Sequence, residues 1–406
     1  MNVFMINTLY YPIELGGTER VVKSLAESLV RAGHQVAVAT ASPGGGARSE
    51  VFNGVTVHYL GVSRFLWPYY PEANPRHLKL IWKGLDTLKT GMVQGLGRLL
   101  DREKPDVVHS HNLPGFSVSA WQAAKARGLP LVHNLHDYSL LCARSSMFKS
   151  GRNCGRPCGT CRLFSFSKRG PSSLVDAVVG VSRFVLDRHL EHGFFARTRQ
   201  REVIFSSCEQ PGRPPSRAGE ARLPLRLGYL GRLQPSKGVE WVLQALQGLS
   251  PEPWELRLAG TGGAEYVSDL KRRFASPRVH FLGFIRPEAL FAEIDLLLVP
   301  SLWQEPFGMI IIEAYAHGVP VIAANRGGIP EIVDEGRTGF IFNPESQESL
   351  RAAIRHYVEQ PLLAARMRSL ALEKAKCFST ARMVDSYLSV YERALQEWDS
   401  NPKPRT

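Results

Sequence analysis

The chain has 406 residues, of which 44% are hydrophobic and 21% charged, which excludes a disordered or fibrous protein and predicts two globular domains. No apolar run reaches the roughly 18 residues of a membrane-spanning helix, and no secretory leader precedes the first strand, so we expect a cytoplasmic protein. The formal net charge is +13, and residues 1–170 hold most of the excess, with 21 Lys or Arg against 10 Asp or Glu. Such a surplus either keeps the chain soluble or attracts phosphate groups.

The N-terminal half alternates strands and helices. The apolar residues of the first helix recur at helical spacing: Val21, Val22, Leu25, Leu29 and Val30. Strands are predicted over residues 3–7, 35–40, 106–109, 129–135 and 177–181, with an antiparallel excursion over residues 52–60. This order predicts a parallel sheet covered by helices. Ser182 is placed to cap the helix after the last of these strands.

An aromatic and basic stretch precedes a long amphipathic helix predicted over residues 77–103. Its apolar members are Phe65, Leu66, Trp67, Tyr69 and Tyr70. Beside the basic half, they predict docking on an anionic membrane surface. Packing against the following helix explains them equally well.

Residues 206–224 have the composition of a linker, and the strand–helix alternation then starts again. The second half predicts strands over residues 226–229, 255–259, 279–282, 296–299 and 320–323, and helices over residues 239–247, 266–275 and 309–316. A last amphipathic helix is expected over residues 379–398. Two doubly wound domains predict a ligand at the carboxyl ends of their strands, in a cleft.

Gly16 and Gly17 lie between the first strand and the first helix. Glycines here let a helix N-terminus approach a phosphate or a sugar. A plain tight turn is the alternative, and the spacing is not that of a dinucleotide-binding loop.

A second strand-end loop carries two cations, Arg232 and Lys237, between Gly231 and Gly238. Cations in this arrangement clamp a diphosphate and neutralise the charge that develops on a leaving group. A solvated basic turn is the alternative reading.

Residues 300–314 carry the strongest indication of function. Glu305 precedes an apolar helix, and Glu313 follows three consecutive isoleucines inside it. A helix that is apolar on most sides is buried, so Glu313 needs a partner, for which we predict a ribose diol. Glu305 is predicted to accept from sugar hydroxyls, while the N–H groups of Phe307, Gly308 and Met309 point outward. A capping pair explains Glu305 in part and Glu313 poorly.

Together these segments resemble the retaining glycosyltransferases of family 4. The resemblance covers nearly the whole chain and rests on residues in a fixed order: Pro12, Gly16, Gly17, Glu19, Arg20, Gly33 and His34; residues 105–109; Gly231, Arg232, Lys237 and Gly238; Gly260 and Gly262; Phe281 and Gly283; Glu305 and Glu313; Gly318 and Pro320; Gly327, Gly328, Pro330 and Glu331; Thr338 and Gly339. It implies the α/β GT-B fold, in which two Rossmann-like doubly wound domains face each other across a cleft.

The resemblance also implies a role for each matching position. Arg232 and Lys237 would hold the diphosphate of the donor and stabilise the leaving nucleotide. Glu313 would bind the ribose, and Glu305 with the backbone of residues 307–309 would hold the sugar hydroxyls. The family needs no metal for catalysis, because the cationic pair replaces it.

In the N-terminal half, His136 matches the family's active-site histidine, which acts near the reacting sugar. Gly16 and Gly17 would approach the donor phosphate or the acceptor. As a bare residue His136 is equally compatible with a buried core histidine. His109 and His111 match less clearly.

The implied reaction is retaining transfer of a hexose-type sugar from a UDP- or GDP-sugar to a glycan or lipid-linked acceptor, in cell-envelope or exopolysaccharide synthesis. Residues 1–206 would form the acceptor-side domain, residues 207–224 the linker and residues 225–379 the nucleotide-sugar domain. Residues 380–406 would pack back on the first domain. The enzyme is expected in the cytoplasm, peripheral to the inner face of the plasma membrane.

Four of the six cysteines lie within twenty residues: Cys142, Cys154, Cys158 and Cys161. Four thiolates bind zinc tetrahedrally, so a structural zinc ion is the first reading of this cluster. Free thiols, or a disulfide or iron–sulfur arrangement, are the alternatives.

Two rival functions remain open. A nucleotide-sugar epimerase or a phosphorylase uses a similar cleft. A basic nucleic-acid-binding or membrane-binding protein with a four-cysteine zinc module is the rival from another class. The cations do not form a run interleaved with aromatics, so we expect no nucleic-acid partner.

Overall fold

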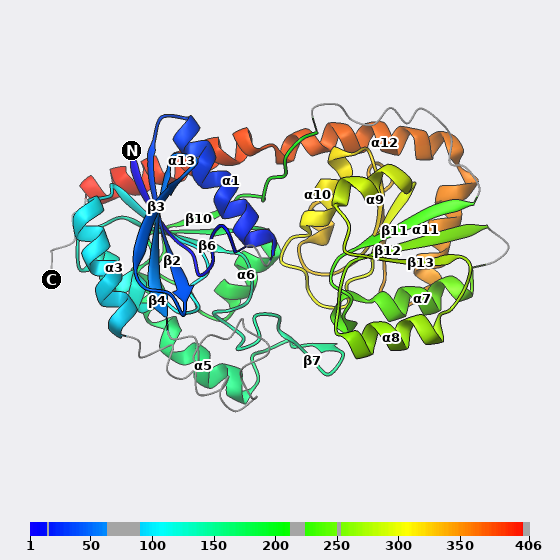
Figure 1. The fold of residues 1–406 in the computed structure, drawn as a ribbon, viewed down its shortest axis with the longest axis horizontal. Coiled ribbons are helices and arrows are strands. Elements are labelled where there is room, and N and C mark those ends of the chain that lie inside the picture. The colour runs from blue at the N-terminus through cyan, green and yellow to red at the C-terminus, as the bar shows by residue number, and fades with distance from the viewer. Residues whose placement is uncertain (14–15, 63–89, 212–223, 250–252, 401–406) are drawn as a thin grey trace. The chain divides into compact units, whose positions relative to one another are not determined.

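The computed structural model describes residues 1–13, 16–62, 90–211, 224–249 and 253–400. The chain divides into two compact units (Figure 1). The N-terminal unit comprises Met1–Met147, Gly155–Phe205 and Thr380–Thr406, and the C-terminal unit comprises Phe148–Cys154 and Ser206–Ser379. The aromatic stretch over residues 65–70 and most of the predicted linker lie outside the described residues.

The N-terminal unit contains an eight-stranded sheet in the order β10-β9-β6-β5-β1-β2-β4-β3. The strands are β1 (Asn2–Ile6), β2 (Gln35–Pro43), β3 (Arg48–Phe52), β4 (Val55–Val62), β5 (Val107–Ser110), β6 (Leu131–Leu135), β9 (Ala177–Gly180) and β10 (Gln200–Val203). All neighbours are parallel except β3 and β4. The predicted antiparallel excursion is therefore wrong in part, because β4 pairs parallel with β2 and only β3 runs the other way.

Six helices belong to this unit in the described part of the chain: α1 (Gly17–Arg31), α3 (Thr90–Glu103), α4 (Ser119–Lys125), α5 (Gly159–Arg169), α6 (Arg183–Glu191) and α13 (Thr380–Ser400). Of the predicted apolar stripe of α1, Val21, Val22, Leu25 and Leu29 are buried, and Val30 is half-buried. Ser182 caps α6, because its side chain accepts from the Val185 N–H. The end of the chain packs on the same unit, where α13 contacts α1 and buries Tyr387 and Tyr391.

The C-terminal unit contains a six-stranded parallel sheet in the order β13-β12-β11-β14-β15-β16. Its strands are β11 (Leu225–Leu230), β12 (Trp254–Ala259), β13 (Val279–Gly283), β14 (Leu296–Val299), β15 (Val321–Ala324) and β16 (Gly339–Phe342). Its helices are α7 (Val239–Gln247), α8 (Ala264–Arg273), α9 (Pro287–Glu293), α10 (Met309–Ala316), α11 (Gln347–Glu359) and α12 (Pro361–Ala375). A short antiparallel hairpin of β7 (Phe148–Lys149) and β8 (Arg152–Asn153) also groups with this unit.

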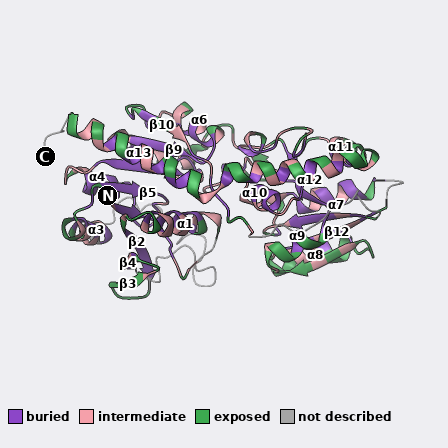
Figure 2. Cartoon of the chain, turned by 90° about the horizontal axis from the view of Figure 1, so that it is seen from above, coloured by how far each residue is buried: buried purple, intermediate pink, exposed green. Residues whose placement is uncertain are grey.

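The central strands are buried on both faces, which is why they read as short, nearly continuous apolar runs (Figure 2). In a parallel sheet the carboxyl ends of all strands lie at one edge. The loops that follow β5 and β6 in one sheet, and β11 and β14 in the other, are therefore gathered at the strand ends. These loops carry the predicted site residues.

No helix within the described ranges combines the length and the apolar character that crossing a bilayer requires. Of the long helix predicted over residues 77–103, the structure describes α3, from Thr90 onward.

Candidate active site

The loops after β11 and β14 meet through an ion pair between Lys237 and Glu305. The Lys237 Nζ lies 2.5 Å from Glu305 Oε1. The same oxygen accepts from Ser301 Oγ at 2.6 Å and from Trp303 Nε1 at 2.8 Å. The Lys237 ammonium also lies 5.0 Å from the centre of the Trp303 ring. Glu305 thus holds a lysine, a hydroxyl and an indole at one point of the strand ends.

Glu305 is buried and ionised. Burial by itself would raise the pKa of this carboxyl, but the charge of Lys237 and the hydrogen bonds from Lys237, Ser301 and Trp303 lower it below its ordinary value. The folded carboxylate therefore contributes stability above the ordinary glutamate pKa, and this contribution is lost as the pH falls through the depressed value.

Glycines let the backbone of these loops approach each other closely. Gly238 has a φ of +72°, and a Cβ at this position would lie 1.9 Å from the Pro300 carbonyl oxygen. Gly260, with a φ of +142°, leaves no room for a Cβ beside the Gly231 carbonyl. The turn that carries Arg232 and Lys237 is therefore held against the ends of its neighbouring strands.

The helix α10 begins where the sequence predicts, at Met309, with Gly308 in front of it at a φ of +126°. Gly308, the N-cap residue, has no side chain with which to cap this N-terminus. Phe307 is buried and lies edge-on to Phe378. Glu313 is half-buried, one turn into α10. The amides of a helix start and a carboxylate thus lie on the element that follows Glu305.

Sequence reasoning missed the role of the β7–β8 hairpin in this site. The Asn153 side chain donates to the Leu302 carbonyl at 2.7 Å and accepts from the Gln304 N–H at 3.0 Å. Both partners flank Trp303, so this asparagine fixes the loop that leads to Glu305. The contact spans about 150 positions of the chain, and no local pattern around Asn153 announces it.

In the N-terminal unit, His136 belongs to a group of histidines at the ends of β5 and β6. His136 Nε2 lies 3.0 Å from His111 Nδ1 and 2.7 Å from the Asn134 side-chain nitrogen. The His109 and His111 rings are 4.0 Å apart, and His109 Nδ1 contacts the Tyr391 hydroxyl at 2.7 Å. The structure thus brings His136 together with the two histidines that matched the family less clearly.

These imidazoles are neutral. Burial lowers the pKa of His109 to about 3, with a further contribution from His136, and lowers the pKa of His136 to about 3 as well. The pKa of His111 also falls well below the ordinary value, because of burial and its histidine neighbours. A neutral imidazole at a strand end can donate or accept a hydrogen bond without adding charge.

Gly16 and Gly17 lie at the start of α1. Gly16 is exposed and in extended backbone, and as the N-cap residue it has no side chain with which to cap α1. The chain leaves β1 near His111, whose N–H donates to the Ile6 carbonyl at 2.8 Å. The two glycines and the histidine group are thus placed at the carboxyl ends of strands in one sheet.

The sulfurs of Cys142 and Cys161 lie 3.8 Å apart. The Arg144 N–H donates to the Cys142 sulfur at 3.3 Å. Burial raises the pKa of Cys161 to about 12, and its contacts with Cys142 and Cys158 contribute to the rise. Cys154 groups with the other unit. Within the described residues, no three His, Cys, Asp or Glu side chains are set around a common point as metal ligands.

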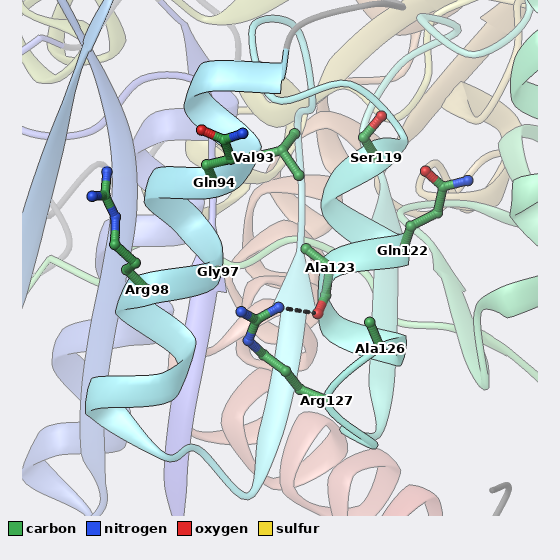
Figure 3. Close-up of a pocket in the computed structure, with 9 residues that line it drawn as sticks. All are labelled: Val93, Gln94, Gly97, Arg98, Ser119, Gln122, Ala123, Ala126 and Arg127. Atoms are coloured by element: carbon green, nitrogen blue, oxygen red, sulfur yellow. Dashed lines mark hydrogen bonds between the residues drawn. The ribbon is translucent and has the colours of Figure 1, made fainter. Parts of the chain in front are cut away.

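A hollow of about 580 Å³ lies between α3 and α4 in the N-terminal unit (Figure 3). It is lined by Val93, Gln94, Gly97, Arg98, Ser119, Gln122, Ala123, Ala126 and Arg127. None of the predicted site residues lines it, so we assign it no part in the chemistry.

Comparison with known proteins decides the family. The model of the glycosyl transferase 4-like domain matches residues 16–206, and that of glycosyl transferases group 1 matches residues 224–360. An uncharacterized 42.6 kDa protein in the cps region of Klebsiella pneumoniae is 31% identical over 82% of this chain and 87% of its own length. The chain belongs to the group 1 glycosyltransferases.

Solved structures place this glycosyltransferase in the GT-B fold, as predicted. Sucrose-phosphate synthase from Thermosynechococcus elongatus superposes with a TM-score of 0.73 and 19% identity, covering 98% of this chain and 99% of that one. The Anabaena protein HepE, solved in complex with UDP and glucose, superposes with a TM-score of 0.70 and 20% identity, covering 97% of this chain and 100% of that one. The family and the fold are confirmed, whereas the roles of individual site residues stay predictions.

Proposed function

We propose that this glycosyltransferase moves a hexose-type sugar, with retention, from a UDP- or GDP-sugar to a glycan or lipid-linked acceptor in cell-envelope or exopolysaccharide synthesis. The observation that carries the proposal is the cluster around Glu305. A lysine, an exposed arginine on the same turn and a helix start with glycine as its N-cap follow strand ends of one sheet. These groups are what a leaving nucleotide diphosphate requires.

In this proposal Lys237 and Arg232 hold the diphosphate, and the amides of residues 307–309 face the sugar. Glu305 has two functions: it orients Lys237 through the 2.5 Å ion pair and accepts from a sugar hydroxyl. Glu313 accepts from the ribose diol. The ion pair holds the lysine in position before the donor binds, so little reorganisation accompanies the reaction.

His136 is proposed to contact the transferred sugar as a neutral hydrogen-bonding group. Its neighbours His111 and Asn134 hold the ring at 3.0 and 2.7 Å. A neutral ring suits a site in which positive charge is reserved for the diphosphate. We do not assign a carboxylate nucleophile, because retention is proposed to proceed by front-face attack.

The relatives agree with this proposal. The HepE structure was determined with UDP and glucose, which are the products of donor hydrolysis. The Klebsiella pneumoniae relative is encoded in a cps region. These properties belong to those proteins, and they direct the first experiment toward UDP-glucose and its epimers.

A panel of UDP- and GDP-sugars tests the proposal, scored by saturation-transfer NMR and by slow hydrolysis of the donor without acceptor. We expect one donor to bind selectively. Glu313→Gln should weaken that binding about tenfold, because it replaces a charged acceptor of two ribose hydroxyls with a neutral amide.

Glu265→Gln, an equivalent change at an exposed position of α8, is the matched control and should bind like the wild type. Equal binding by Glu313→Gln would remove Glu313 from the donor site. Conversion of a nucleotide sugar to its epimer, or phosphorolysis of a glycan, would replace the transferase proposal with one of its rivals.

We also propose a structural zinc ion bound by the predicted cysteine cluster, of which Cys142, Cys158 and Cys161 belong to the N-terminal unit. The 3.8 Å between the sulfurs of Cys142 and Cys161 equals the edge of a tetrahedron with Zn–S bonds of about 2.3 Å. The Arg144 N–H already points at one sulfur, as amides do around metal-bound thiolates. Cys158 precedes α5 as its N-cap and contacts Cys161, so it would supply a third thiolate, with Cys154 as the predicted fourth.

Metal analysis of the purified protein tests the zinc proposal. We expect about one zinc ion per chain in the wild type and in Cys377→Ser, which changes an exposed cysteine elsewhere. Cys161→Ser should lose most of the zinc. A wild-type protein without zinc, or a disulfide between Cys142 and Cys161 in mass spectrometry, would contradict the proposal.

A further inference from the structure

The helix α5 lies on the surface of the N-terminal unit. None of its residues is buried. Leu163 is 74% exposed and Phe166 is 81% exposed. They are two of the three large apolar residues that the described part of the N-terminal unit leaves exposed, the third being Val51. Three positions apart on a helix, they lie on one face.

The segment around α5 is also strongly basic. Between Asp137 and Asp176 the sequence contains no Asp or Glu and seven Lys or Arg: Arg144, Lys149, Arg152, Arg156, Arg162, Lys168 and Arg169. Arg162 and Arg169 are exposed, and their positions on the helix flank Phe166. The apolar face is therefore bordered by cations.

Acidic groups of neighbouring elements offset only part of this charge. The nearby α6 contributes Arg188, which donates to the Gly155 carbonyl at 3.3 Å and pairs with Glu191. Lys168 donates to the Ser139 carbonyl at 3.1 Å, and its charge also acts on the buried Asp137 carboxyl. Figure 1 shows α5 at the periphery of its own unit, away from the sheet.

From this surface we infer that α5 docks the N-terminal unit on a membrane that exposes anionic phospholipid headgroups. Exposed Leu and Phe beside Lys and Arg, without acidic residues, is the arrangement with which interfacial helices bind such surfaces. The apolar side chains enter the boundary between headgroups and acyl chains, and the cations contact the phosphates. A protein partner would be expected to meet this helix with acidic side chains, whereas a membrane supplies both apolar and anionic groups at once.

The surface consists of other residues than the aromatic stretch over residues 65–70, and it does not depend on the identity of the sugar donor. Each cation near an anionic membrane contributes about a fivefold gain in binding. The attraction is screened by salt, because it acts across the water of the interface.

Sedimentation of the full chain with vesicles tests the inference. We compare vesicles of phosphatidylcholine alone with vesicles that also contain phosphatidylglycerol, at low and high salt. The wild type should bind the second kind only, and salt should weaken this binding. Leu163→Ser with Phe166→Ser should lower the partition coefficient at least about tenfold, and Arg162→Gln about fivefold.

The matched controls are Leu362→Ser and Arg272→Gln, which change exposed residues on helices of the C-terminal unit. Both should bind vesicles like the wild type. Because the three α5 residues are exposed, the variants should also keep the wild-type unfolding transition. Binding that ignores the phosphatidylglycerol, or that survives the α5 changes, would overturn the inference. The inference would also be overturned if the protein bound a soluble anionic polysaccharide through α5 but did not bind the vesicles.

Discussion

Lys237→Ala should slow sugar transfer by about 100-fold or more. In the proposed site the lysine stabilises charge that appears on the leaving diphosphate, and groups aimed at developing charge typically contribute about that much to the rate. Binding of the intact donor should change less, because Arg232 is proposed to hold the diphosphate as well. Steady-state rates with the donor identified by the panel, together with donor affinities from NMR, separate the two effects.

The same substitution should also lower the stability of the protein. Removing Lys237 leaves the buried Glu305 carboxylate without its ion, and breaking such a pair costs about 3–5 kcal/mol. The double variant Lys237→Ala with Glu305→Gln removes the unpaired charge but keeps an acceptor for Ser301 and Trp303. We expect it to recover stability in urea unfolding while transfer stays slow.

Lys271→Ala, which removes a cation from the surface of α8, should leave both properties unchanged. If the double variant recovered wild-type turnover, Lys237 would serve the fold and not the reaction. Wild-type turnover in Lys237→Ala itself would remove the lysine from the proposed mechanism.

The sequence predicted the parallel core well because those strands carry their own signal. Residues such as Leu296–Val299 are apolar on both faces, and α10 begins and ends where its apolar run does. Short or half-exposed elements were missed. The hairpin β7–β8 has two residues in each strand, which is too few for a periodicity, and α5 buries none of its residues, so no packing against the core marks it.

The candidate site divides in the same way. The sequence predicts which glycines, cations and carboxylates lie at strand ends, because the topology of a parallel sheet gathers them at one edge. It does not predict which of these groups pair with one another. Lys237 and Glu305 were predicted to bind separate parts of the donor, yet in the structure they contact each other. That contact joins positions 68 residues apart, and it depends on the backbone approach that Gly238 permits.

We expect the N-terminal unit to lose stability steeply as the pH falls below about 6.5. Five of its histidines, His109, His111, His133, His136 and His189, have pKa values lowered chiefly by burial. The unfolded chain binds their protons below about pH 6.5, whereas the folded chain does not. Each histidine thus costs about 1.4 kcal/mol per pH unit below that value, down to about pH 3 for His109 and His136.

The structural reason is that several of these rings have no place for a second proton. The Nε2 atoms of His109, His111 and His189 are buried and have no hydrogen-bond partner within the described chain. Protonation would bury an unpaired N–H together with a charge. Summed over the five histidines, the loss at pH 5.5, one unit below the ordinary value, should be roughly 5–7 kcal/mol, which is a large part of the stability of a typical domain.

Urea unfolding at a series of pH values measures this slope, and two variants assign it. His109→Asn should make the dependence of the free energy of unfolding on pH shallower by the contribution of one titrating group, whatever its effect on stability at neutral pH. Tyr391→Phe removes only the hydroxyl 2.7 Å from His109 Nδ1, so it should lower stability and keep the wild-type slope. The slope depends on which groups titrate, whereas a lost hydrogen bond lowers the free energy of unfolding equally at every pH. A stability that is constant between pH 7 and pH 5 would show that these histidines take up protons within the folded unit, and the neutral site proposed around His136 would then be wrong.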